Sequence, residues 1–444
     1  MEIPEATSRS GQTQSIPAAS ETQNYSRPLA IVTTLFFMWG FLTCLNDILV
    51  PHLKSIFDLD YAQVMLVQFA FFSAYFLFSV PWSRIVNRIG YQRTMVVGLL
   101  TMAVGAFLFV PAASAVSYPL FLSALLVLAT GITGLQVAAN PYVVVLGKPK
   151  TASSRLDLTQ AFNSLGTAIA PKIGGLLILS AAPLAMEQLR ALSPQALHAY
   201  RVQEAASVKM PYTAISIALL LLAVVIGTFK LPKIGHAEYR AAGKVDDSIW
   251  NHPNLVLAAI GIFAYVGAEV SIGSFLVNYF SLPEISGFSA KTAAGFVSFY
   301  WGGAMIGRFL GAELLRRIKP GNLLGLCAVS AAALVTLSMV LSGHGAMWSI
   351  LAVGFFNSIM FPTIFSLGVA ELGPLTGNGS GLLNMAIVGG AILPVMQGVI
   401  ADRVGIHHAF FLPVICYLYI LYYGLSGSKP NSERAHGNAH RMKT

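Results

Sequence analysis

The sequence predicts an all-α membrane protein whose twelve transmembrane helices form two pseudo-symmetric six-helix bundles. Composition is the first of three observations behind this prediction. Of the 444 residues, 55% are hydrophobic and only 10% are charged, with a mean hydropathy of +0.69, whereas soluble domains carry about 25% charged residues. A soluble core could not bury so much apolar surface, so lipid must surround most of the chain. Disordered, collagen-like and nucleic-acid-binding classes are thereby excluded.

Twelve apolar stretches are the second observation, because a helix needs roughly 20 residues to cross a bilayer. Runs such as Ala214–Ile226 do not alternate apolar and polar residues, which excludes a β-barrel. The stretches cover residues 28–51, 61–84, 94–113, 118–146, 157–182, 210–230, 254–281, 290–315, 321–342, 346–370, 380–401 and 405–426.

Internal repetition is the third observation. The glycines and the proline of residues 166–175 recur in residues 389–398, at an offset of 389 − 166 = 223. Pro141, near the end of the fourth stretch, matches Pro362 near the end of the tenth, at an offset of 362 − 141 = 221. Glycines and prolines that recur at matching positions six helices apart indicate a duplicated unit, as in transporters whose two halves rock around a central site.

The pattern divides the chain into five segments. Residues 1–26 are polar and lack the basic, apolar and small-residue order of a signal peptide. The predicted segments are a disordered cytoplasmic leader (1–26), an N-terminal bundle (27–230), a cytoplasmic linker (231–253), a C-terminal bundle (254–426) and a cytoplasmic tail (427–444).

The basic residues predict the orientation. The net charge of +9 suggests a polyanionic partner, but the 27 Lys and Arg are spread over many short segments. Most lie at the termini and around the loops after helices two, four, six and eight, which the positive-inside rule places in the cytoplasm. We therefore expect both termini in the cytoplasm and no nucleic-acid partner.

Two carboxylates lie inside predicted helices, where a charge costs about 2.5–3.5 kcal/mol on insertion scales. Asp47 is in helix one and Glu269 in helix seven, and 269 − 47 = 222 lies between the repeat offsets of 221 and 223. Each is either a structural hydrogen-bonding hub or a group facing a central cavity that binds a sugar hydroxyl, a proton or a sodium ion. Lys172 in helix five either pairs with a carboxylate or extends to the outer surface.

Neutral amides accompany the two acids. Pairs spaced three or four residues apart share a helix face, and amides both donate and accept hydrogen bonds, as a neutral sugar requires. Interhelical packing is the alternative for each of them. The amides are Asn46, Gln136, Asn140, Gln160, Asn163, Asn278, Asn357 and Asn384. Four aromatic residues are candidates to pack on a sugar ring, or else face lipid or the core: Trp39, Phe162, Trp301 and Phe361.

Arginines mark a candidate gate. Arg84, Arg88, Arg308 and Arg317 fall at predicted cytoplasmic helix ends, where they can lock the two bundles together. Phosphate-binding loops, dinucleotide fingerprints, zinc-protease motifs and nucleophile elbows are all missing. We therefore expect neither an enzyme nor a bound metal or cofactor.

Four motifs resemble a known family, the fucose–galactose–glucose:proton symporters of the major facilitator superfamily. The likeness runs from about residue 28 to residue 426, and GAEVSIG at residues 267–273 is similar to the bacterial glucose/galactose transporter branch. The motifs are GFLTCLNDIL (40–49), LQVAANPY (135–142), QAFNSLG (160–166) and FPTIFSLG (361–368).

The resemblance implies roles for particular residues. Asp47 matches the family's helix-one acid, and Asn163, with Gln160 beside it, matches the sugar-site asparagine. Gln136 replaces the helix-four glutamate of the fucose branch, while Glu269 stands where that branch has glutamine. The second acid has thus moved to the other half, which leaves Na⁺ open as the coupling ion although H⁺ is favoured.

The resulting hypothesis is a monomeric symporter of the bacterial inner membrane that imports a neutral hexose, glucose or galactose. Ion coupling would involve Asp47 and Glu269. Sugar contacts are expected from Gln136, Asn140, Gln160, Asn163, Asn278, Asn384 and Phe361. An N-acetylhexosamine or fucose permease is the alternative within transport, and a membrane sugar sensor without transport is the alternative of another class.

Overall fold

The computed structural model describes residues 25–57, 61–178, 192–232 and 247–429. For residues 45–56, 61–66 and 171–178, and for three single residues, the description covers the backbone alone. Nearly all of the predicted leader, most of the linker and most of the tail therefore lie outside the described residues. Within the described residues, helices and short turns account for the regular structure, without a strand, and the predicted all-helical membrane fold is confirmed.

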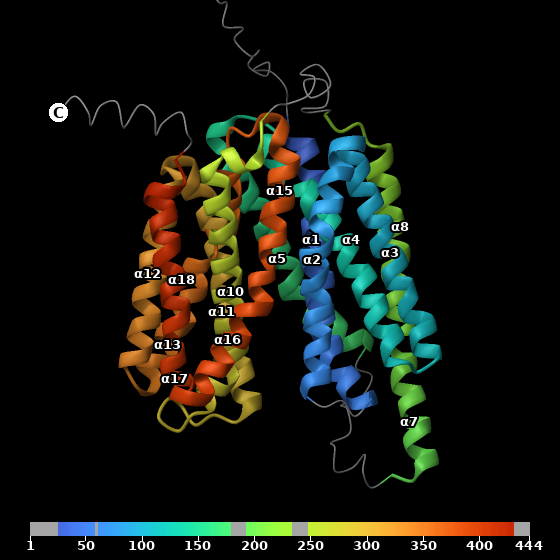
Figure 1. Cartoon of the computed structure of the whole chain (residues 1–444). Helices are drawn as coiled ribbons and strands as arrows, with labels where there is room; N and C mark the ends of the chain where they lie inside the picture. The colour runs from blue at the N-terminus through green and yellow to red at the C-terminus, as the bar shows by residue number, and fades with distance from the viewer. Residues whose placement is uncertain (1–24, 58–60, 179–191, 233–246, 430–444) are drawn as a thin grey trace, which may run out of the picture.

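The first half of the chain supplies six helical segments (Figure 1). They are α1 (Ser26–Phe57), α2 (Tyr61–Ile89), α3 (Tyr91–Ser114), α4 (Tyr118–Val145), α5 (Ala152–Ile178) and a sixth made of α7 (Pro194–Ser207) and α8 (Lys209–Thr228).

The second half repeats this count with more interruptions. Its segments are α10 (Pro253–Ser281), α11 (Ala290–Arg317), α12 (Pro320–Val340), α13 (Gly343–Asn357) with α14 (Met360–Gly368), α15 (Thr376–Met385) with α16 (Gly389–Val404), and α17 (Ile406–Ala409) with α18 (Phe411–Tyr422). A 3₁₀ turn at Ala386–Val388 joins α15 to α16.

Ten segments among the described residues are long and apolar enough to cross a membrane. The other two of the twelve are α5 and α11, which carry several charged residues and pack against each other. Their polarity has a structural reason, since they meet between the two halves and are partly shielded from lipid. The sixth segment begins at Pro194, earlier than the predicted 210, because the polar helix α7 extends it beyond the neighbouring helices (Figure 1).

Glycines at corresponding positions of the two halves let helices approach closely. A Cβ on Gly166 of α5 would lie 2.3 Å from the Phe37 carbonyl oxygen of α1. A Cβ on Gly389 of α16 would lie 2.1 Å from the Phe263 carbonyl oxygen of α10. Both positions therefore require a residue without a side chain, and the glycines of the sequence repeat have the same packing role.

Both ends of the described chain lie at one end of the molecule, where α1 begins and α18 leads into its final turn (Figure 1). We call this the terminal end. Helices that run up and down in succession also bring to it the last turn of α2 and the first turn of α5. In the second half, the last turn of α11, the end of α14 and the start of α15 lie there.

Candidate functional site

One face of α5 forms a polar stripe between the two halves. Apart from the adjacent Ser153 and Ser154, its members recur at spacings of three or four residues, so they lie above one another on the helix. All five are buried. From the terminal end inward the stripe consists of Ser153, Ser154, Asp157, Gln160 and Ser164.

The outermost serines of the stripe bind the second half directly. The Ser153 and Ser366 hydroxyl oxygens lie 2.7 Å apart, which joins α5 to α14. The Ser154 hydroxyl donates to the Ala312 carbonyl oxygen of α11 at 2.6 Å. These bonds hold the halves together near the terminal end.

Arg308 of α11 continues the contact toward the centre. Its Nη1 donates to the Ser164 hydroxyl and, at 3.5 Å, to the Gln160 carbonyl oxygen. Its Nε donates to the Ser358 carbonyl oxygen at 3.2 Å. That carbonyl would accept from residue 362 in a regular helix, but Pro362 has no N–H. Arg308 therefore bonds a carbonyl that a proline has freed, and reaches the other half with the same guanidinium.

The repeat places a similar arrangement in the other half. Pro141 of α4 cannot donate to the Val137 carbonyl oxygen, and the Ser380 hydroxyl of α15 donates to it at 2.9 Å. Each proline-freed carbonyl thus takes a side-chain donor, and Ser380 makes its bond across the boundary between the halves.

Replacing Ser380 by alanine should weaken closure of the terminal end. The buried Val137 carbonyl would lose its partner, which costs about 1–3 kcal/mol, or about ten- to a hundredfold in the ratio of closed to open molecules. Spin labels on cysteines introduced at exposed Lys150 and Lys319, one in each half, would report the change as a longer distance. Ser123→Ala is the control, because exposed Ser123 bonds its own helix. An unchanged distance distribution in Ser380→Ala would contradict this role.

Helices α2 and α15 complete the closed end. The Asn87 amide donates to the Asn378 side-chain oxygen at 2.5 Å. A Cβ on Gly377 would lie 2.3 Å from the Asn87 side-chain oxygen, and one on Gly381 would lie 2.7 Å from the Ser83 Cβ. Small residues four apart let helices approach closely in a membrane, so these glycines set the distance between the halves.

Buried amides lie deeper in the same region. The Gln136 Nε2 donates to the Tyr75 hydroxyl at 2.6 Å, and the Asn384 Nδ2 donates to the Ser380 carbonyl oxygen at 2.8 Å. Several polar atoms have no hydrogen-bond partner among the described residues, namely the Gln136 and Asn384 side-chain oxygens, the Gln160 side-chain nitrogen and both polar atoms of Asn140. Buried polar groups normally find partners, so these atoms are available to a polar ligand or to water.

Three other predicted sugar contacts differ in their surroundings. Asn163 is half-buried, and its Nδ2 donates to the Phe36 carbonyl oxygen at 3.0 Å, linking α5 to α1. Phe361 is buried beside Phe365, with ring centroids 6.1 Å apart. Asn278 is exposed and is not part of the buried amide group.

Of the two predicted ion-coupling acids, the structure describes the side chain of Glu269 alone. The Glu269 Oε1 accepts a hydrogen bond of 2.8 Å from the Tyr265 hydroxyl one turn earlier on α10, and the side chain is half-buried. Arg308 lies within electrostatic range of it. Asp47 belongs to α1, but its side chain, like those of Asn46 and Lys172, lies outside the described residues.

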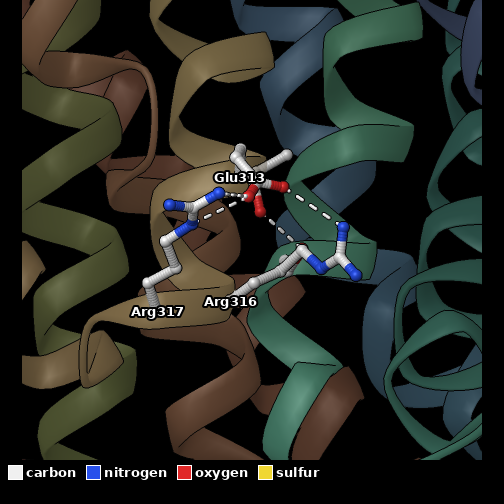
Figure 2. A network of polar contacts seen from close by, with 5 residues as sticks. Glu313, Arg316 and Arg317 are labelled. Carbon is white, nitrogen blue, oxygen red and sulfur yellow. Dashed lines mark hydrogen bonds and ion pairs between the residues drawn. The ribbon is translucent and has the colours of Figure 1, made fainter.

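The predicted gate arginines separate into two groups. Arg308 contacts the other half, although it lies nine residues before the end of α11. Arg84 and Arg88 are exposed, and the Asn87 amide between them makes the contact with α15. Arg317 pairs with Glu313 of its own helix at 2.8 Å, and Arg316 pairs with the same carboxylate at 3.2 Å (Figure 2). Exposed pairs of this kind contribute little, about 0–1 kcal/mol.

Aromatic candidates also differ in position. Phe162 of α5 contacts Phe309 of α11 with ring centroids 6.0 Å apart, so it joins the halves. Trp39 is buried against Phe36, whereas Trp301 is 42% exposed. Asn357, another predicted amide, is buried and donates to the Tyr300 hydroxyl at 2.7 Å.

Sequence reasoning missed two buried polar residues. Asp157 and Gln397 are fully buried, and none of their side-chain polar atoms has a partner within the described part of the chain. Asp157 could have been identified from the sequence, since it precedes Gln160 by three residues and so shares its helix face. Over the same described residues, no group of three or more His, Cys, Asp or Glu could hold a metal ion.

Two bundles of six helices with a polar boundary define a membrane transport fold, and comparison with known proteins specifies it further. The model of the Major Facilitator Superfamily matches residues 30–394. The glucose/galactose transporter of Brucella abortus is 53% identical over 410 residues, covering 92% of this chain and 96% of that protein. The L-fucose-proton symporter of Escherichia coli is 36% identical over 420 residues, with 92% and 96% covered.

Solved structures agree with these relatives. A crystal structure of the superfamily transporter FucP in the outward conformation has a TM-score of 0.84 and 34% identity, covering 92% of this chain and 100% of that one. The chain belongs to the Major Facilitator Superfamily and, within it, to the fucose–galactose–glucose:proton symporter family. It is therefore a multi-pass membrane protein.

Proposed function

We propose that this chain imports a neutral hexose, glucose or galactose, by ion-coupled symport with alternating access. The observation that carries the proposal is the buried amide group between two halves that hydrogen bonds join near the terminal end. Such a group can exchange hydrogen bonds with sugar hydroxyls. The curated relatives named glucose/galactose transporters support the choice of sugar.

The conformation and the orientation belong to the same proposal. The basic residues favour a terminal end in the cytoplasm, and this end is closed in the structure. The molecule would then be open outward, as the related crystal structure is described. The protein would act as a monomer in the bacterial inner membrane, with sugar and lipid as its partners.

Coupling to H⁺ is favoured over Na⁺. Asp47 matches the family's acid, and Glu269 is the second acid, held by the Tyr265 hydroxyl. We assign Asp47 the coupling role and Glu269 a supporting role at the sugar or the ion. A fucose or N-acetylhexosamine permease would differ in its preferred sugar, and a sensor would bind sugar without moving it.

Replacing Asn163 by alanine tests the sugar site. Loss of an amide that bonds sugar and α1 should weaken sugar affinity about ten- to a hundredfold, because an unpaired buried group costs about 1–3 kcal/mol. Binding of a panel of hexoses to the purified protein would measure this. Asn278→Ala is the informative comparison, since exposed Asn278 lies apart from the buried amides. Unchanged hexose affinity in Asn163→Ala would contradict the site.

A further inference from the structure

Asp157 is a carboxyl group for which the proposed transport site has no role. It lies in the second turn of α5, within the polar stripe, and is fully buried. It faces α11 so closely that a Cβ on Gly311 would lie 2.7 Å from its Oδ2. The same Cβ would lie 2.2 Å from the Ile359 side chain, at the break between α13 and α14. Asp157 is therefore at the boundary between the halves.

The surroundings of Asp157 compensate a negative charge only in part. Neither of its carboxyl oxygens has a hydrogen-bond partner among the described residues. Arg308 of α11 lies within electrostatic range, but its hydrogen bonds to Ser164, Gln160 and Ser358 go elsewhere. A buried charge without hydrogen bonds costs much more than a buried neutral group, so the closed boundary favours the neutral acid.

Other ionisable groups on α4, α5, α11, α12 and α14 do not change this balance. The Cys327 thiol of α12 is also within electrostatic range, and α14 contributes no ionisable residue. On α5 itself, Arg155 donates to the Val143 and Val144 carbonyl oxygens. The Tyr142 hydroxyl of α4 donates to the Pro232 carbonyl oxygen. Farther along α11, Glu313 is exposed and paired with two arginines.

The internal repeat gives an independent reason for a neutral side chain. Asp157 corresponds to Ser380, because 380 − 157 equals the repeat offset of 223. Ser380 uses its O–H to bond the Val137 carbonyl that Pro141 frees in the other half. The corresponding freed carbonyl is that of Ser358, next to Ile359, and in the closed structure the Arg308 Nε donates to it. A carboxylic acid has an O–H donor at this position, whereas a carboxylate has only acceptors.

We propose that Asp157 is a proton-dependent latch of the terminal end, neutral while the halves are closed there and ionised once they part. This inference rests on the alternating access of the proposed function. On opening, the carboxyl O–H gives its proton to water at that side, and on closing the carboxylate takes a proton from the same side. No net proton crosses the membrane through this residue, so the latch adjusts the conformational equilibrium and leaves coupling to Asp47 and Glu269.

The latch makes closure depend on the pH at the terminal end. Where opening releases one proton, the ratio of open to closed molecules rises up to about tenfold for each pH unit. A more alkaline cytoplasm would then favour opening inward, and a more acidic one would keep the terminal end closed. The direction suits a protein that releases cargo into the cytoplasm.

Distances between spin labels at positions 150 and 319 test the latch in the full-length protein, without sugar and without an ion gradient. In the parent protein, the ratio of open to closed molecules should rise with pH. In Asp157→Asn this rise should be smaller by the contribution of one proton, which is up to about tenfold per pH unit. Glu313→Gln is the matched control, since it removes an exposed acid from the same end, and it should keep the parent slope. An unchanged slope in Asp157→Asn overturns the latch.

Infrared spectra of the closed protein give a second test that does not depend on movement. At neutral pH the protonated-carboxyl absorption of the parent protein should exceed that of Asp157→Asn by one carboxyl group, whatever Asp47 and Glu269 contribute to both proteins. Asp157→Ser covers the case in which the asparagine variant does not fold. If both variants keep the full absorption of the parent protein, Asp157 is not a neutral acid and the proposal fails. If the pH dependence of opening requires Asp157 but the protein accumulates no hexose, the proposed function is wrong and the latch is not contradicted.

Discussion

Asp47→Asn is expected to abolish accumulation of sugar against its gradient while sugar exchange across the membrane continues. Asparagine keeps the shape of the side chain but cannot gain and lose a proton, so the coupled step is lost and the alternating movement remains. Uptake into proteoliposomes under an imposed ion gradient would fall to the equilibrium level. Counterflow with unlabelled sugar inside would persist.

Glu269→Gln should differ, since it is expected to impair sugar binding as well as accumulation. The Tyr265 hydroxyl holds the Glu269 carboxylate at 2.8 Å, so a neutral amide there changes the acceptors that a sugar meets. Asp402→Asn provides the matched control, because this acid is exposed at the end of α16. If Asp47→Asn still accumulates sugar, its coupling role is wrong.

Gly381→Leu should hold the terminal end open and stop transport. Even a Cβ at this position would lie 2.7 Å from the Ser83 Cβ and 3.2 Å from the Ser79 carbonyl oxygen. These atoms belong to or adjoin the backbone, so α2 and α15 must move apart. The expected result is a folded, inserted protein with no net sugar uptake and a long distance between labels at positions 150 and 319.

A matched substitution separates this effect from a general defect. Among the residues that the structure describes, no heavy atom lies within 4 Å of a Cβ added to Gly295 of α11, so Gly295→Leu should keep both transport and the closed end. Normal uptake by Gly381→Leu would show that the close approach of α2 and α15 is not required for the cycle.

The helices and their pairing in two halves could be predicted from the sequence because lipid imposes a simple rule. Every span needs about 20 apolar residues, and the prolines and glycines of the duplicated unit recur at nearly the same offset. Pro141 and Pro362 prove to have matching consequences, since each frees a carbonyl that a side chain then bonds. The interruptions in helices ten and eleven were not predicted, because a broken helix stays equally apolar.

The direction in which each polar residue points could be predicted less well. Gln136, Asn140 and Asn384 are buried, but Asn278, an amide of the same kind, is exposed. In an apolar helix the hydrophobic pattern does not distinguish the lipid-facing side from the side that packs on other helices. The burial of Asp157 depends on the neighbouring Gly311 of the other half, which only the folded structure brings near.

Uptake of labelled glucose and galactose into proteoliposomes, with proton and sodium gradients imposed separately, tests the central claim most directly. The account predicts that an inward proton gradient drives accumulation of at least one of these hexoses, that a protonophore abolishes it and that a sodium gradient alone has no effect. Accumulation driven only by sodium would contradict the assigned ion. Failure to move either hexose under any gradient would contradict the proposed symport itself.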